Sequence, residues 1–348
     1  MNYVGIDLHR DFFVSAAQDD SGNELFRKRY NNSIASVEEL TLQFNSPPMI
    51  VVEATRNWMW FIIALQKRGY PVQLAHPLRT KATASARIKT DSIDAKTLCD
   101  LLRADLIPKS YIANPEELDN RELARGRINL VHDQTLYKNR IMAILGKENL
   151  RFKGRDLFGI KGKAWLKEQL LSNTKRQMIE VYMRRLSDVQ VAINTVDSLI
   201  KQRSSGIPEV KLLTSIPSIG PTTAFLLVSE IGNITRFPNS KKFASYFGIT
   251  PRLSQSGNHA YYGRITKLGN LYVRWSLGQA AHRLARMDPE YKKFVDRISY
   301  RGGKKKAIVA LSRKLATIVY YVLKENRVYE KRTKQSLKVC PAIILERS

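Results

Sequence analysis

The stretch Tyr3-Val4-Gly5-Ile6-Asp7-Leu8-His9 is a short, partly β-branched apolar run that meets one carboxylate. Runs of this length are typical of a strand in a buried sheet, and alternating apolar residues continue through Phe12, Val14 and Ala16. The pattern therefore predicts that Asp7 lies at the carboxyl end of a first strand. An aspartate at such a place also serves simply to end a strand or to cap a turn, so Asp7 alone does not define a site.

The elements after this strand predict a mixed sheet. Three strands in a meander are followed by the order helix, strand, helix, strand, which implies parallel pairing with crossover helices. The predicted strands are Tyr3–Asp7, Phe12–Ala17, Glu24–Tyr30, Met49–Glu53 and Pro71–Leu74, and the predicted helices are Ser36–Phe44 and Trp58–Arg68. Three antiparallel strands followed by a βαβ unit is the layout of the ribonuclease-H-like fold.

Four carboxylates gather where this fold would hold a metal. The first and fourth strands would be neighbours, so Asp7 and Glu53 would face each other and require a cation between them. Asp91 and Asp94 are three apart and share one face of a predicted helix. Acidic residues in a first helical turn also favour the helix dipole, which accounts for one aspartate but not for four carboxylates.

Carboxylate oxygens favour Mg²⁺ or Mn²⁺, and two such ions would stabilise the entering and leaving oxygens of a phosphodiester displacement. The four residues therefore predict a metal-dependent nuclease or strand-transfer site. His9 and His76 are interpreted as packing or phosphate-contacting residues and not as ligands.

The charge of the chain calls for a polyanionic partner. Its 348 residues carry a formal net charge of +27, and residues 241–348 hold 24 lysines and arginines against 6 acidic residues. So large a bias indicates nucleic acid rather than a merely solvated face, without distinguishing DNA from RNA. Cys99 and Cys340 form no metal or disulfide pattern, no apolar run is long enough for a membrane span, and the chain begins directly on its first strand. These features predict a cytoplasmic, nucleoid-associated protein that has no membrane partner.

The sequence is predicted to divide into four parts. They are a nuclease domain over 1–111, a helical coiled-coil spacer over 112–205, a serine-bearing helical domain over 206–330 and a basic tail over 331–348. Asn114-Pro115-Glu116-Glu117 has the pattern of a capped helix start, and this helix is expected to continue to about Leu145. A second helix carries a heptad seam, which packs either within the chain or between subunits. The seam residues are Tyr182, Leu186, Val189, Ile193, Val196 and Ile200.

The C-terminal part combines turns with cations. Ile216–Ala224, which contains Gly220, resembles a helix-hairpin-helix whose turn amides grip a phosphate, although a plain αα-hairpin fits as well. Residues 247–270 are expected to form a mobile phosphate-contacting loop, followed by helices over Leu271–Ala285 and Lys304–Leu323. The residues predicted to contact nucleic acid are Arg79, Lys89, Gly220, Arg252, Arg264, Lys267, Lys304 and Lys305.

Four motifs together resemble the DEDD transposases of bacterial insertion sequences, the IS-one-ten family, which is related to Piv-type DNA invertases and RuvC junction resolvases. They are Gly5-Ile6-Asp7-Leu8-His9, Val52-Glu53-Ala54-Thr55, His76-Pro77-Leu78-Arg79 and Lys89-Thr90-Asp91-Ser92-Ile93-Asp94-Ala95. Arg56, Asn57 and His76 depart from the expected family pattern, whereas the four acidic residues do not. The resemblance implies a RuvC-like domain and cutting and rejoining of double-stranded donor and target DNA.

The family's second signature is similar to the stretch from Pro251 to Asn270. It implies that Ser256 is a nucleophile that forms a phosphoserine bond to DNA, with Ser254 as the fallback; Ser256 would otherwise be a turn residue. The resemblance also implies a dimer or tetramer in which one subunit's carboxylates meet another's serine. A structured non-coding guide, the bridge RNA, is implied as a further partner.

Three other classes remain as alternatives. A RuvC-type junction resolvase would use the four carboxylates for two-metal hydrolysis and would not need Ser256. A non-catalytic nucleic-acid-binding protein would not need the carboxylates. A sugar-kinase or actin-like ATPase should follow Asp7 with small residues, where Leu8, His9 and Arg10 stand here.

Overall fold

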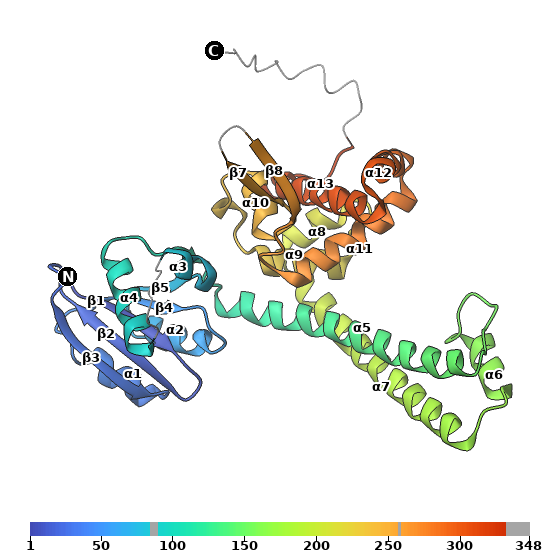
Figure 1. Cartoon of the computed structure of the whole chain (residues 1–348), viewed down its shortest axis with the longest axis horizontal. Helices are drawn as coiled ribbons and strands as arrows, with labels where there is room; N and C mark the ends of the chain where they lie inside the picture. Colours follow the sequence, from blue (N-terminus) through green and yellow to red (C-terminus); the bar gives the residue numbers. More distant parts are fainter. Residues whose placement is uncertain (84–89, 257–258, 332–348) are drawn as a thin grey trace, which may run out of the picture. The chain divides into compact units, whose positions relative to one another are not determined.

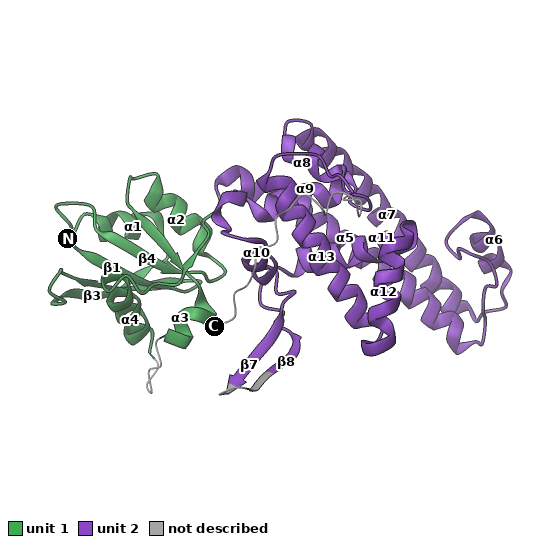
Figure 2. Ribbon diagram, turned by 90° about the horizontal axis from the view of Figure 1, so that it is seen from above, with its two compact units in different colours: residues 1–113 green, residues 114–348 purple. Residues whose placement is uncertain are grey.

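The computed structural model describes residues 1–83, 90–256 and 259–331 of the chain. Its contacts divide the chain into two compact units, 1–113 and 114–348, which are coloured separately in Figure 2. Lys89, Cys340 and all of the expected basic tail except Lys331 lie outside the described residues. Each unit is described by itself.

Unit 1 is built on a six-stranded sheet in the order β3-β2-β1-β4-β5-β6. The strands are β1 (Tyr3–Leu8), β2 (Phe12–Gln18), β3 (Glu24–Asn31), β4 (Met49–Glu53), β5 (Val72–Ala75) and β6 (Lys109–Ser110). The pairs β1–β2 and β2–β3 are antiparallel, whereas β1–β4 and β4–β5 are parallel. The mixed sheet of the ribonuclease-H-like prediction is therefore confirmed, and β6, only two residues long, was not predicted.

Helices cover both faces of this sheet. Val4, Ile6 and Leu8 of β1 belong to one apolar cluster, which includes residues of α1 (Ile34–Thr41) and α2 (Trp58–Gln66). Because side chains alternate along a strand, Tyr3, Gly5 and Asp7 point to the opposite face. That face is covered by α4 (Asp91–Arg103), while α3 (Pro77–Thr83) follows β5 (Figure 2). Asp7 therefore faces the helix that begins with the other two aspartates.

Gly5 sets how closely α4 approaches β1. A Cβ atom at this position would lie 2.2 Å from the carbonyl oxygen of Ala95 and 2.4 Å from the amide nitrogen of Cys99. Any larger residue would therefore push the helix outward. The thiol of Cys99 donates a hydrogen bond to the carbonyl of Tyr3 at 3.2 Å, which ties the helix and strand together beside this contact. The glycine thus fixes the distance between Asp7 and the first turn of α4.

A long helical hairpin opens unit 2. α5 (Pro115–Lys147) begins with the predicted capping box, in which Asn114 and Glu117 each accept a backbone hydrogen bond from the other. α7 (Asn173–Ser204) runs back along it, and the short helix α6 (Ile160–Glu168) lies between them in the chain, at the far end of the hairpin (Figure 1). The lysine- and glycine-rich stretch of residues 146–162 suggests a break between the two long helices, but its last three residues already belong to α6.

The heptad seam of α7 packs within the chain. Leu186 shares an apolar cluster with Ile141 and Leu145 of α5, whereas Ile200 shares another with Ala124 and Ile128. Between the clusters, the side chains of Gln134 and Gln190 are hydrogen-bonded at 2.8 Å. Of the two alternatives for the seam, intramolecular packing is the one that the structure supports.

The rest of unit 2 forms one large core around α9 and α13. Its elements are α8 (Pro208–Thr214), α9 (Pro221–Ile231), the 3₁₀ turn η1 (Ile234–Arg236), α10 (Ser240–Tyr246), β7 (Pro251–Ser256), β8 (His259–Ile265), α11 (Leu271–Met287), α12 (Pro289–Gly302) and α13 (Lys304–Lys324). The sequence did not predict α12. The sequence Arg301-Gly302-Gly303-Lys304-Lys305-Lys306 suggests a basic turn, but Arg301 and Gly302 lie in the last turn of this helix.

A buried ion cluster joins α5 to α9. The carboxylate of Glu230, whose side chain is only 3% exposed, accepts from Arg125 Nε at 2.6 Å and Nη2 at 2.9 Å. Arg121 Nε donates to the carbonyl of Ser229 at 2.8 Å. Two residues after Arg125, Arg127 donates from Nε to the carboxylate of Asp197 on α7 at 2.7 Å. These contacts fix the base of the hairpin to the core.

No helix in the described part of the chain is long and apolar enough to cross a membrane.

Candidate metal centre and serine-bearing hairpin

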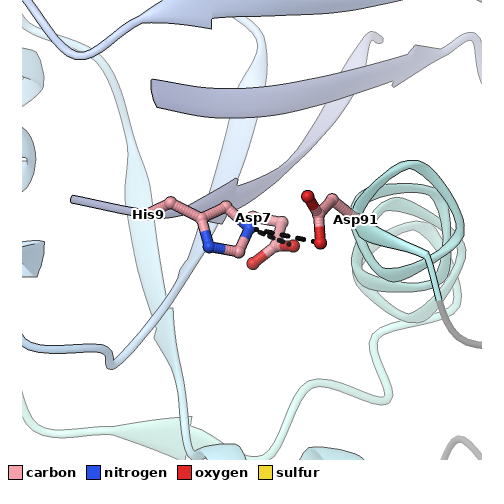
Figure 3. Close-up of side chains that lie close together, drawn as sticks. All are labelled: Asp7, His9 and Asp91. Carbon is pink, nitrogen blue, oxygen red and sulfur yellow. Dashed lines mark hydrogen bonds and ion pairs between the residues drawn. The ribbon is translucent and has the colours of Figure 1, made fainter. Parts of the chain in front are cut away.

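Asp7 lies at the carboxyl end of β1, in the centre of the sheet, and is 5% exposed. Its Oδ2 atom is 3.1 Å from His9 Nε2, and the same nitrogen is 3.4 Å from Asp91 Oδ1 (Figure 3). One ligand atom from each of the three residues lies within 4.8 Å of the other two. The structure therefore brings Asp7 and Asp91 together, 84 positions apart in sequence.

Burial raises the pKa of the Asp7 carboxyl, because desolvation disfavours its charged form. The charges of Asp91 and Asp94 raise it further, while the charge and hydrogen bond of His9 lower it. Three like charges in one place are costly unless a cation shares them. The electrostatics of Asp7 are those of a group that a bound cation would stabilise.

The first turn of α4 positions the two helical aspartates. Thr90 caps the helix by accepting a hydrogen bond from the amide of Ile93 at 3.2 Å. Asp91 and Asp94 lie in the first turn, where negative charge also suits the helix dipole. The first turn of α4 therefore combines the two interpretations of these aspartates: they suit the helix dipole, and they lie near Asp7. Asp91 is half exposed, with a side-chain exposure of 49%, so ligands in solution can reach it.

Glu53 is the last residue of β4, whose parallel register with β1 pairs Ile6 with Val52. Asp7 and Glu53 are the next residues after this pair, which is the last one in the register between β1 and β4. They therefore lie at the same end of two adjacent strands. The predicted neighbouring ends of the first and fourth strands are confirmed. The close metal-compatible group among the described residues comprises Asp7, His9 and Asp91, without Glu53. A role for Glu53 as a ligand stays a prediction.

His9 was set aside in the sequence-based interpretation, yet it lies between the two aspartates. Its ring stacks on Phe12 at 4.5 Å between centroids, and the guanidinium of Arg29 lies 3.6 Å from the centroid of Phe12. This stack holds the imidazole beside the carboxylates. Its spacing of two residues from Asp7 was the available signal, because alternate residues of an extended segment point to the same side.

The donors at this site fit a hard divalent cation. Two carboxylates offer oxygen atoms, the ligand type that Mg²⁺ and Mn²⁺ prefer, and one imidazole nitrogen lies with them. The buried position of Asp7 and the raised pKa of its carboxyl are the observations that support a cation here. Among the described residues, Asp7, Asp91 and His9 form a close group that could hold a metal, and the parts of Glu53 and Asp94 stay predictions.

Two family models match the chain. The model described as "Transposase IS116/IS110/IS902 family" matches residues 210–296, and a DEDD transposase model of the IS110 type matches residues 4–148. The pilin gene-inverting protein of Moraxella bovis is 32% identical over 353 residues, which cover 95% of this chain and 98% of that protein. The chain belongs to the IS116/IS110/IS902 family of transposases.

The transposase also resembles two proteins described as transposases of insertion sequence elements. That of IS1111A from Coxiella burnetii is 24% identical and covers 94% of this chain and 90% of its own. That of IS1328 from Yersinia enterocolitica is 24% identical and covers 94% and 98%. The resemblance inferred from the motifs is thus confirmed, and this protein is a DNA transposase or recombinase whose DEDD domain suggests the use of divalent metal.

The strands β7 and β8 of the transposase pair as a hairpin, where the sequence predicted a mobile loop. β7 and β8 pair antiparallel, with Ser254 opposite Tyr261 and Ser256 opposite His259. The glycines, hydroxyls and spaced cations of this stretch had suggested a loop. Ser256 is the last residue of β7, and Gly257 and Asn258, which follow it, lie outside the described residues.

The glycine of Phe247-Gly248-Ile249 anchors the base of this hairpin. Gly248 has a φ of +68°, and a Cβ there would lie 2.2 Å from the carbonyl oxygen of Leu268. Arg274 Nη1 donates to the carbonyls of Phe247 at 3.1 Å and Lys267 at 3.3 Å. The glycine sequence attributed to loop mobility therefore serves close packing of two segments against each other.

The residues predicted to contact nucleic acid lie on several elements. Arg79 lies on α3, Gly220 precedes α9, Arg252 and Arg264 lie on the hairpin, Lys267 follows it, and Lys304 and Lys305 begin α13. All of these cationic side chains are exposed. Their exposure is compatible with binding phosphates, and their roles stay predictions.

Proposed function

We propose that this transposase cuts and rejoins DNA by combining a Mg²⁺ or Mn²⁺ site at Asp7, Glu53, Asp91 and Asp94 with a serine nucleophile, Ser256. The observation that supports the metal half of the proposal is the meeting of Asp7, His9 and Asp91 within 4.8 Å. The serine half rests on the likeness of the hairpin sequence to the second signature of the family.

At the carboxylate site, the residues of the chain have separable tasks. Asp7 presents a buried charge from the end of β1, and Asp91 presents a half-exposed one from α4. His9 holds Oδ2 of Asp7 through Nε2 and so restricts the rotation of that carboxylate. Bound divalent ions would supply charge stabilisation to the entering and leaving oxygens of the phosphodiester.

The serine step exchanges one phosphoester bond for another. The Oγ atom of Ser256 attacks phosphorus, its proton passes to a base, and the displaced deoxyribose oxygen leaves and takes up a proton. The strand end then stays attached as a phosphoserine ester, and attack by another DNA hydroxyl releases the serine. His259 is the register partner of Ser256, and the exposed Arg264 and Lys267 are nearby in sequence to balance phosphate charge.

The partners of this reaction are donor and target DNA duplexes and, by family resemblance, a structured guide RNA. A net charge of +27 suits a complex with more than one polyanion. We infer a dimer or tetramer, in which the carboxylates of one subunit act with the serine of another.

The deciding experiment looks for a covalent protein–DNA adduct. The full-length protein is incubated with Mg²⁺, the non-coding RNA that flanks its gene, and end-labelled DNA of its element, then separated on a denaturing gel. We expect an adduct with the wild type and with Ser254→Ala, but none with Ser256→Ala. Asp7→Asn should also abolish it, because cleavage requires the metal site.

Each alternative has its own outcome. If Ser256→Ala cuts DNA as fast as the wild type and no adduct forms, the protein is a hydrolytic nuclease of the junction-resolvase type. If Ser254→Ala alone removes the adduct, Ser254 is the nucleophile. Cleavage that is unchanged when the RNA is omitted would contradict the guide, and a monomer in solution and on DNA would contradict the shared site.

A further inference from the structure

The junction between α12 and α13 carries a fully exposed aromatic residue among cations. We define this basic elbow as residues 297–306, which join the end of α12 to the start of α13 (Figure 1). Tyr300 within it is 94% exposed, the most exposed of the exposed tyrosines in the described chain. A large side chain in this position makes almost no contact with its own protein.

Tyr300 lies on the side of α12 that faces away from the core. Tyr291 and Val295 are the buried residues of this helix, and Ile298 is partly buried beside them. At about 100° per residue, Tyr300 lies roughly 180° around the helix from Tyr291. Folding therefore does not account for an aromatic residue at the centre of the polar face.

The surroundings of Tyr300 are strongly positive. Residues 292–306 contain seven lysines and arginines against one acidic residue, Asp296. No ion pair joins any of these seven cations to a carboxylate within the described part of the chain. By contrast, Arg125 and Arg127 of α5 are both paired with carboxylates. These seven cations, five of which belong to the basic elbow, are left for an external anion.

A cavity of about 420 Å³ opens at the same place. Its lining consists of Arg297, Ile298, Arg301, Gly302 and Lys306, with three cations and no carboxylate. Arg297 lies three positions before Tyr300 and is therefore its neighbour on the helix surface, and Arg301 is the next residue in the sequence. An aromatic face and a positive hollow thus lie side by side on one turn of α12.

We propose that the basic elbow binds an unpaired nucleotide strand, with Tyr300 stacking on a base and Arg297, Arg301 and Lys306 contacting phosphates. Cations alone would serve duplex DNA equally well, because a duplex presents its phosphates but covers the faces of its bases. A free aromatic ring gains from stacking only when a base face is open, as in a single strand. This site is additional to the carboxylates and Ser256, and the proposal does not depend on either of them.

The test measures the binding of a labelled twelve-nucleotide strand by fluorescence anisotropy with the full-length protein. Oligo(dT) and oligo(U) probe DNA and RNA, and a blunt duplex of mixed sequence is the comparison. Tyr300→Ala should weaken binding of single strands by about fivefold to 150-fold, the range typical of one stacked base. Tyr300→Phe keeps the ring and should bind within about twofold of the wild type.

Two matched variants separate stacking from charge. Tyr321→Ala removes another exposed tyrosine, on α13 and outside the basic elbow, and should leave binding unchanged. Arg301→Ala should reduce the slope of log affinity against log salt by about one, for both single strands and duplex. Thermal unfolding of each variant shows whether it is folded, which is expected because Tyr300 and Arg301 are exposed.

Every outcome decides the proposal. Selective loss of single-strand binding in Tyr300→Ala supports it, and the stronger of the two oligonucleotides identifies DNA or RNA as the strand. An equal loss for single strands and duplex overturns stacking and leaves only a phosphate contact. Unchanged binding in Tyr300→Ala overturns the site, and an altered oligomeric state in that variant would assign the tyrosine to a protein contact instead.

Discussion

Replacing Asp7 by asparagine should make the metal-free protein more stable while abolishing its activity. Asp7 is 5% exposed and lies beside the charges of Asp91 and Asp94, so its own charge is buried unfavourably. Asparagine has nearly the same shape and keeps a polar oxygen that can accept from His9. Removal of the charge should therefore stabilise unit 1 by about 0.5–2 kcal/mol in the absence of divalent ions.

Magnesium should reverse this order. A ligand that binds only the folded state stabilises it by RT ln(1 + [L]/Kd), or about 1.4 kcal/mol at ten times Kd. The wild type should gain this amount and Asp7→Asn little of it. In thermal unfolding, each kcal/mol corresponds to about 4 °C for a unit of this size. The control Asp105→Asn changes an aspartate that is 83% exposed, at a φ of 52° that asparagine tolerates, and should respond to Mg²⁺ like the wild type.

The pH dependence follows from the sign of the pKa shift. The folded-state pKa of Asp7 is raised above its ordinary value, so the charge penalty is complete only above the folded pKa. As the pH falls through that value toward the unfolded one, the folded protein takes up the proton first and the penalty disappears. The metal-free wild type and Asp7→Asn should therefore converge in stability in acid. A variant that is less stable than the wild type in EDTA at neutral pH, or that gains as much from Mg²⁺, would refute the reasoning.

Three further predictions concern packing and turns. Gly5→Ala should lower the free energy of unfolding in urea by about 1–3 kcal/mol and reduce DNA cleavage, because the added Cβ would displace α4. The control Gly126→Ala, which adds a Cβ in open space on α5, should be neutral or slightly stabilising. A harmless Gly5→Ala would contradict the close contact. Glu230→Ala should destabilise unit 2 by about 3–5 kcal/mol, since it leaves Arg125 without its buried partner, and a loss below about 1 kcal/mol would argue against a buried ion cluster. Ser218→Gly should raise the free energy of unfolding by about 1 kcal/mol in the same assay. Ser218 has a φ of 77° and a buried hydroxyl without a hydrogen-bond partner among the described residues. An unchanged urea midpoint would mean that the backbone of Ser218 is not strained.

The sheet of unit 1 could be predicted because the signals for its strands lie within short stretches of the sequence. Apolar alternation marks β1 and β2, and the order of strands and helices implies which strands are neighbours. The strand ends place Asp7 and Glu53 without knowledge of any side-chain contact. The proximity of Asp91 to Asp7 followed only from the family resemblance and the assumed fold, because the two are joined through the packing of α4 on Gly5.

Some features that the sequence analysis missed depend on contacts between distant segments. His9 stacks on the nearby Phe12, but its role is defined by Asp91, which lies 82 positions away in the sequence. The strands β7 and β8 do not alternate regularly between apolar and polar residues, so the sequence gives little period-two signal for them. The seam of α7 indicated a partner helix but could not identify it, because α5 of the same chain and a second subunit would show the same heptads.

The length of the helical hairpin of α5 and α7 would enlarge a small rotation at its base into a longer movement at its far end. The pair between Arg127 and Asp197 lies near its base, and its far end has a separate small core around Ile141 and Leu166. From Arg127 to the end of α5 the helix extends about 30 Å, so a tilt of roughly 10° at the base would displace α6 by about 5 Å. A modest rotation at one end, such as docking on a bulky substrate could produce, therefore becomes a movement at the other end larger than a hydrogen bond can span.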